Sequence, residues 1–123
     1  MERAAEYARR RAELHERMLS RADLPMKRFL ALDRDVYEDG ALRGIEKELM
    51  GLVASTVLRC NDCVSYHLIE ATRHGATAPQ ILEALDIALV VGGSITIPHI
   101  RHALAFLDTI DPEDVRAERR KEA

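Results

Sequence analysis

The sequence predicts an all-α protein, and three observations lead to this prediction. Apolar residues recur at the three- and four-residue spacing of helices, and no convincing alternating run or Asn-Gly or Asp-Gly turn indicates a strand. Tryptophan is absent and aromatic residues make up only 4% of the chain. Because 123 residues suit one domain, we expect a single compact helical domain over residues 1–123, with about six helices and a core at about 41–107.

Two helices are expected before this core. Residues 2–21 contain i, i+4 pairs of opposite charge such as Glu6 and Arg10, but their apolar stripe is thin, which indicates a helix on the outside of the molecule. Pro25 suits the first turn of a second helix, which should run to a stop at Gly40.

The strongest amphipathic pattern lies in the middle of the chain. A helix is expected from about residue 42 to a turn near Arg59, and a second helix from Cys60 to a stop at Gly75. The buried face of the first of these should comprise Leu42, Ile45, Leu49, Leu52, Val53 and Thr56.

The C-terminal third should hold two more helices. Thr77 and Gln80 form a capping box for a helix from Ile81 to Val91, which is apolar on most sides, as expected in a core or a subunit interface. The last long helix should cover residues 99–110, and Asp111-Pro112 should cap a frayed tail. Between these helices, an interruption is expected at Gly92, Gly93 and Pro98.

Composition excludes several classes of function. The net charge is −3 with acids and bases mixed along the chain, so no nucleic-acid surface is indicated. The longest apolar run, residues 87–100, is too short and too rich in glycine to span a membrane. The N-terminus is charged from residue 2 and is no secretory signal, so we expect a cytoplasmic protein.

Both cysteines of the chain, Cys60 and Cys63, precede His67 at helical positions i, i+3 and i+7. In a reducing compartment such a pair is more often catalytic or metal-binding than a structural staple. A helix N-terminus favours thiolate, and His67 could take the proton of Cys63. A redox pair, a metal site and a plain structural role remain open, and the redox pair is favoured because zinc would need a fourth ligand.

The preceding helix supplies a carboxylate. Glu48 lies on a stripe of small residues, Gly44, Gly51 and Ser55. If the two helices pack antiparallel, Leu52 lies level with His67, and Glu48, one turn further, could orient His67 in a proton relay. The alternative is that Glu48 is a solvated charge and that His67 is a helix-surface histidine.

His99 and His102 are three residues apart on the last long helix. They could form a metal pair, but surface or interface histidines are the favoured interpretation. We expect no metal and no bound organic cofactor.

The pattern formed by Glu48, Cys60, Cys63 and His67 resembles the active site of the alkylhydroperoxidase D-like family within the carboxymuconolactone decarboxylase superfamily. The resemblance implies an all-helical homo-oligomer, a trimer or a hexamer, that reduces peroxides or protein disulfides. Cys63 would be the attacking thiolate, Cys60 its more exposed partner, and Glu48 and His67 the relay. Electrons would come from an external dithiol, such as a lipoyl group or a small redox protein.

The chain departs from the family pattern at Asp62, where the well-known member has a histidine, and a carboxylate there disfavours a neighbouring thiolate. Two other functions stay open. One is a related enzyme acting on an unknown small molecule, although decarboxylation is disfavoured because true carboxymuconolactone decarboxylases lack the cysteine pair. The other is a helical scaffold whose thiols sense redox state without turnover.

Overall fold

The computed structural model describes residues 1–122 and the side chains of residues 1–118. Over this range the chain forms helices and no strand, which confirms the predicted all-α fold. No helix in the same range combines the length and the apolar content that crossing a bilayer requires. The elements are α1 (Ala4–Arg21), α2 (Leu24–Val36), α3 (Gly44–Val57), α4 (Asn61–Arg73), α5 (Ala78–Gly92), the 3₁₀ turn η1 (Ser94–Thr96), α6 (Ile97–Leu107) and α7 (Pro112–Glu122).

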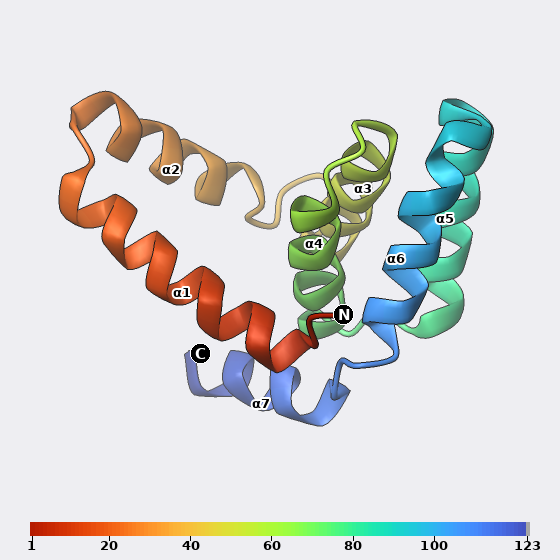
Figure 1. Cartoon of the computed structure of the whole chain (residues 1–123). Coiled ribbons are helices and arrows are strands. Elements are labelled where there is room, and N and C mark those ends of the chain that lie inside the picture. Colours follow the sequence, from red (N-terminus) through yellow and green to blue (C-terminus); the bar gives the residue numbers. More distant parts are fainter. Residues whose placement is uncertain (123) are drawn as a thin grey trace.

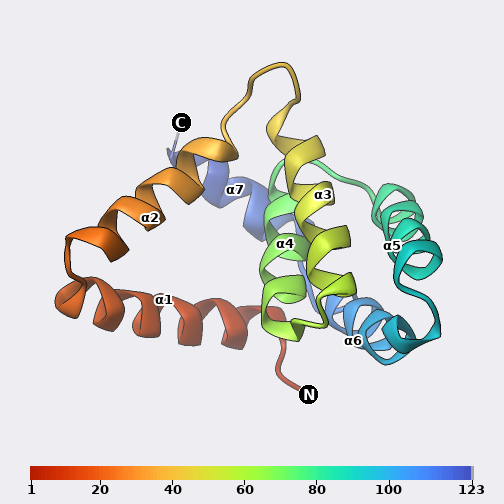
Figure 2. The same cartoon turned by 90° about the horizontal axis from the view of Figure 1, so that it is seen from above.

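Helices α3 and α4 form an antiparallel pair at the centre of the molecule (Figure 1). Helices α5 and α6 pack on one side of this pair, and α7 crosses beneath it. Helices α1 and α2 form a V-shaped hairpin on the other side, and its tip lies far from the core in both views (Figures 1 and 2).

Apolar side chains from the central pair and its neighbours form the core. Tyr7 brings α1 onto it, because its buried ring packs edge-on against Phe106 with centroids 5.6 Å apart. Burial of this apolar area is the main favourable term in folding. The largest fully buried apolar side chains are Leu52, Val64, Leu68, Ile81, Leu85 and Phe106.

Helix α2 begins as predicted, with Pro25 in its first turn, but it ends at Val36 rather than at Gly40. The Lys47 ammonium donates to the carbonyl oxygens of Val36 and Glu38 at 2.8 and 2.6 Å. These bonds satisfy carbonyls that a longer helix would have used internally, so the chain turns early.

Helix α3 begins at Gly44, two residues later than the pattern suggested. The Asp39 carboxylate accepts the Gly44 N–H at 2.6 Å and so fixes the start of the helix. Leu42 therefore precedes the helix and is exposed, which corrects its assignment to the buried face.

The breaks around α5 are confirmed. Thr77 and Gln80 exchange the two hydrogen bonds of a capping box. Gly93 has a φ of 81°, which favours glycine, and Pro98 lies in the first turn of α6.

The expected frayed tail is instead part of α7, which packs against α4. The Arg73 guanidinium bonds the Glu118 carboxylate at 2.9 Å, and Arg116 donates to a backbone carbonyl of α4 at 3.2 Å. These contacts hold a segment that its composition alone does not stabilise. Ala123 lies outside the described residues.

Two histidines join α6 to the N-terminal half of α4. His99 Nδ1 lies 2.7 Å from the Asn61 side-chain oxygen, and His102 Nε2 lies 2.9 Å from the Ser65 hydroxyl oxygen. Their side-chain partners on α4 differ, the Asn61 amide for His99 and the Ser65 hydroxyl for His102. Burial lowers the pKa of His102, the charge of His99 lowers it further, and a hydrogen bond to the Asn61 backbone opposes both effects.

Acidification should therefore weaken the fold through His102. The unfolded chain, in which the imidazole has its ordinary pKa of 6.5, binds the proton more readily than the native chain. Stability should thus be highest above pH 6.5 and fall as the pH drops below it. The free energy of unfolding in urea should fall between pH 8.0 and pH 5.5, and it should fall less for His102→Gln than for the parent. His15→Gln, on α1, is the control, and an equal loss in parent and His102→Gln would contradict the assignment.

Candidate active site

A tight turn at residues 58–60 sets the geometry of the site. The N–H of Cys60 donates to the Ser55 carbonyl at 3.0 Å, and that of Arg59 donates to the Thr56 carbonyl at 3.1 Å. Together with the left-handed φ of 61° at Arg59, this is a Schellman motif that ends α3. The chain then re-enters a helix at once, so α4 folds back along α3.

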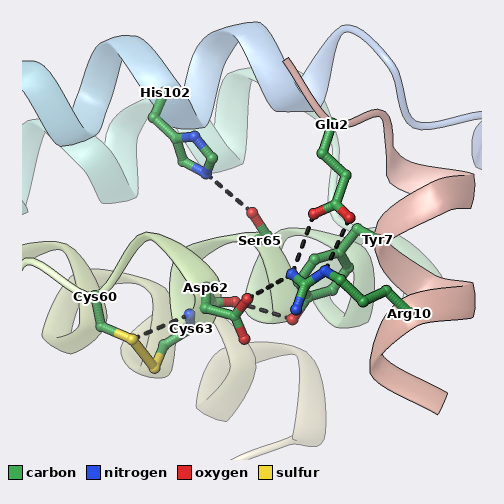
Figure 3. Close-up of polar contacts among 8 residues, drawn as sticks. All are labelled: Glu2, Tyr7, Arg10, Cys60, Asp62, Cys63, Ser65 and His102. Atoms are coloured by element: carbon green, nitrogen blue, oxygen red, sulfur yellow. Dashed lines mark hydrogen bonds and ion pairs between the residues drawn. A yellow bond between two sulfur atoms is a disulfide. The ribbon is translucent and has the colours of Figure 1, made fainter. Parts of the chain in front are cut away.

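Cys60 is the N-cap of α4, and its sulfur accepts the Cys63 N–H at 3.2 Å. The two cysteines form a disulfide across this first turn, with Cα atoms 5.2 Å apart (Figure 3). The three-residue spacing therefore brings the two sulfurs together, as the favoured redox pair requires.

The exposure of the two cysteines reverses the expectation. Cys60 is half-buried, whereas Cys63 is exposed. Cys60 sits at the turn against α3, and Cys63, one helical turn on, lines an open cleft. Cys63 is therefore the more accessible of the two cysteines.

His67 and Glu48 meet across the α3–α4 interface. His67 Nδ1 lies 2.8 Å from Glu48 Oε2, and the two side chains are only 11% and 5% exposed. An ionised Glu48 can only accept, so in the neutral form of the imidazole Nδ1 carries the proton and Nε2 carries the lone pair. Glu48 thus holds the imidazole in the tautomer that a proton acceptor for a neighbouring thiol needs. The surface alternatives for both residues are wrong, because both are buried.

Gly51 makes room for this imidazole. A Cβ at Gly51 would lie 2.5–2.8 Å from three atoms of the His67 ring, closer than atoms can approach. The expected register was one residue off, because Gly51 rather than Leu52 faces His67. Leu52 points into the core and is fully buried. The aromatic rings of Tyr37 and Tyr66, centred 5.7 and 5.2 Å away, flank the His67 ring.

Cys63 and His67 open into the same cleft of about 230 Å³. One wall of this cleft comes from α1 and α2, which lie outside the expected core of residues 41–107. Burial raises the pKa of Tyr66 to about 12, so its phenol stays protonated near neutral pH. The cleft is lined by Tyr7, Arg11, Asp33, Tyr37, Asp62, Cys63, Tyr66 and His67.

A larger polar cavity of about 560 Å³ lies alongside and shares Arg11, Asp33, Tyr37 and Tyr66 with the cleft. On its wall, ligand atoms of Glu48, Glu70 and His74 lie within 4.8 Å of one another. Sequence reasoning missed this cluster, although the i, i+4 spacing of Glu70 and His74 on the face that holds His67 offered a signal. Two of its members already serve other groups: Glu48 bonds His67, and Glu70 bonds Arg73 at 2.7 Å.

Residues 23–108 match the sequence model of the carboxymuconolactone decarboxylase family. The chain belongs to this family. It is 40% identical over 83 residues to "Uncharacterized protein 4 in cox locus" of Paracoccus denitrificans. The aligned region covers 68% of this chain and 75% of that protein. It is also 31% identical over 64 residues to alkyl hydroperoxide reductase AhpD of Corynebacterium kroppenstedtii, over 52% of this chain and 37% of that protein.

Solved structures agree with this family assignment. A carboxymuconolactone decarboxylase family protein of Thermotoga maritima, for which an antioxidative response is named as a possible role, is 52% identical with a TM-score of 0.79. The match covers 96% of this chain and 97% of that one. A family protein of Legionella pneumophila, 22% identical over 85% of this chain and 94% of that one, shares the fold with a TM-score of 0.78.

The contact between Gly51 and His67 is open to a direct test in this family member. Gly51→Ala should displace the imidazole and slow oxidation of the reduced cysteine pair by hydroperoxide roughly 10- to 100-fold. Alanine is more favourable than glycine in the interior of a helix, so the helix content measured by circular dichroism should not fall. Gly40→Ala is the matched control, because its added Cβ would meet only Lys47 Nζ, at 3.8 Å. Equal oxidation rates for Gly51→Ala and the parent would show that His67 does not need this space.

Proposed function

We propose that this family member is a thiol-dependent oxidoreductase that reduces hydroperoxides or protein disulfides by cycling Cys60 and Cys63 between dithiol and disulfide. The observation that supports this most is the shared cleft: Cys63 and His67 both line it, while Glu48 holds the far side of the imidazole. The likeness to an alkyl hydroperoxide reductase and to a protein named with an antioxidative response points the same way.

The proposed peroxide reaction has three balanced steps. His67 Nε2 takes the proton of the Cys63 thiol, and the thiolate attacks the outer oxygen of the hydroperoxide. The O–O bond breaks, Cys63 becomes a sulfenic acid, and the departing alkoxide takes the proton back as an alcohol. The Cys60 thiol then attacks the Cys63 sulfur, which forms the disulfide and releases water.

An external dithiol closes the cycle. It attacks the disulfide, is itself oxidised to a disulfide, and returns the two cysteines to thiols. A lipoyl group or a small redox protein has the right chemistry. This requirement fits the cytoplasm, where dithiols are kept reduced.

The roles of the two sulfurs can be separated by substitution. Cys60→Ser should keep the cap on α4, because a serine hydroxyl accepts the same N–H. It should form a sulfenic acid at Cys63 that dimedone traps, but no intramolecular disulfide. Cys63→Ser should lose peroxide reactivity. Mass spectrometry of the labelled chain and peroxide consumption with dihydrolipoamide measure both.

Two outcomes would contradict the proposal. Dimedone labelling of Cys60 in Cys63→Ser, with none at Cys63 in Cys60→Ser, would reverse the roles of the sulfurs. One round of oxidation in the parent without turnover by any dithiol would instead favour the redox sensor.

We also propose that the protein works as a homo-oligomer, a trimer or a hexamer. Only Ile81, Leu85 and Ala88 of α5 are buried within the chain. An apolar groove of about 570 Å³ runs between α3 and α5, and α5 contributes Ala84, Ile87 and Val91 to it. Exposed apolar area of this extent indicates a partner surface. The five most exposed of the large apolar side chains described on and after α5 are Leu82 (48%), Ile87 (56%), Val90 (82%), Val91 (68%) and Ile95 (51%).

This assembly should depend on the outer face of α5. Light scattering at micromolar concentration should show an oligomer for the parent. Val90→Asp should shift it towards monomer, because an unpaired carboxylate would be buried at the interface. Glu83→Gln, an exposed position on the same helix, is the control. A monomeric parent would refute the proposal.

A further inference from the structure

Asp62, the residue that departs from the family pattern, is held by an ion pair. One Asp62 carboxylate oxygen lies 2.8 Å from Arg10 Nη2. Glu2 accepts from Nε at 2.9 Å and also from Nη2 at 3.1 Å, so Nη2 is shared by the two carboxylates (Figure 3). The Arg10 cation therefore lies between two carboxylates, one of which stands between the two cysteines in sequence.

Helix α1 presents Arg10 from a fixed position. Tyr7, one turn earlier and only 2% exposed, donates its hydroxyl to the Asp62 carbonyl at 2.9 Å. Burial raises the pKa of Tyr7 to about 12, so the hydroxyl remains a donor at neutral pH. The Arg10 guanidinium also lies over the Tyr7 ring, 5.3 Å from its centroid. α1 is thus anchored to the first turn of α4 by both the backbone and the side chain of Asp62.

The charge of Asp62 bears directly on the neighbouring thiol. A carboxylate beside a cysteine raises the cost of forming thiolate, and a cation close to the carboxylate offsets that cost. We propose that Arg10 is a positioning residue that pairs with Asp62 and thereby keeps Cys63 available as a thiolate, an inference that rests on the proposed function. Arg10 comes from α1, which precedes the family match at residues 23–108.

Other titratable groups face Cys63 and set a common background. These are Tyr7 and Arg11 on α1, Asp33 on α2, Tyr37 at the C-cap of α2, and Asp62, Tyr66 and His67 on α4. Arg11 is a second cation, but its guanidinium stacks over the Tyr66 ring at 4.3 Å. Among the residues that the structure describes, Arg10 is the cation that forms an ion pair with Asp62.

The ion pair is too exposed to act mainly through stability. The Arg10 and Asp62 side chains are 43% and 62% exposed, and pairs of this kind contribute little to folding. Removing the charge of Arg10 should therefore leave the fold intact and change the chemistry of the thiol.

The test uses the full chain with Cys60→Ser, so that Cys63 is the one cysteine. The rate of alkylation by iodoacetamide, followed from pH 5 to pH 10, gives the pKa of the Cys63 thiol. Arg10→Gln should raise this pKa by about 0.5, which lowers alkylation about threefold below the pKa. Arg10→Lys should restore most of the loss, and Asp62→Asn should lower the pKa. Arg9→Gln, which removes the same charge one position earlier, should leave the pKa unchanged.

A double substitution decides whether Arg10 acts through Asp62. Arg10→Gln should have a smaller effect on the thiol pKa when Asp62→Asn is already present. The inference is overturned if Arg10→Gln and Arg9→Gln give the same thiol pKa. It is also overturned if Arg10→Gln shifts this pKa equally in the presence of Asp62 and of Asp62→Asn. Alkylation by iodoacetamide needs neither peroxide nor dithiol, so it measures the thiol pKa independently of catalysis. If the parent protein showed no peroxidase or disulfide reductase turnover, the proposed function would be contradicted, and the thiol pKa values would still test the role of Arg10.

Discussion

The hydrogen bond between Glu48 and His67 is the interaction on which the rest of the site depends. It joins two side chains that are almost fully buried, at 2.8 Å, across the packed faces of α3 and α4. An ionisable pair in such a place is retained only with good geometry, because each partner without the other would be left buried and unsatisfied. The two helices must therefore lie close enough for this hydrogen bond to form. Gly51 allows this approach because it has no Cβ to collide with the imidazole.

The spacing of the motif in sequence follows from this geometry. Glu48 and Gly51 lie one turn apart on α3, and the Schellman turn at Arg59 reverses the chain within three residues. α4 then starts at its N-cap, Cys60, and one further turn separates Cys63 from His67. The backbone of a single helical hairpin thus brings a carboxylate, an imidazole and two sulfurs together, and the outer helices add a wall of the cleft and the contacts to Asp62.

Much of this could be predicted from the sequence because it is local. Helical periodicity gave the helices, and the spacing of Cys60, Cys63 and His67 on one face gave the sulfur pair. The register across the interface was less certain: a one-residue error put Leu52 where Gly51 lies, because periodicity fixes a face and not a contact. The greater exposure of Cys63 was missed because it depends on how α3 covers the turn.

The contributions of α1, α2 and α7 could not be predicted, because they rest on contacts between residues far apart in sequence. Tyr7 and Arg10 meet Asp62 more than 50 positions away, and nothing in a charged, weakly amphipathic helix identifies that partner. The charged residues of α7 likewise predict a solvated tail, because the sequence does not indicate the contact between Arg73 and Glu118. Sequence reasoning thus identified the residues that meet at the site, and the tertiary structure revealed what surrounds them.

The most direct test of the account is the rate at which hydroperoxide oxidises Cys63 in Glu48→Gln. Glutamine can still accept the Nδ1–H bond but carries no charge, so the fold should persist while the imidazole becomes a poorer proton acceptor. The account predicts a second-order rate about 100-fold below the parent, with unchanged helix content, and a parent-like rate for Glu83→Gln on α5. A parent-like rate in Glu48→Gln would contradict it and reduce the buried pair to a structural contact.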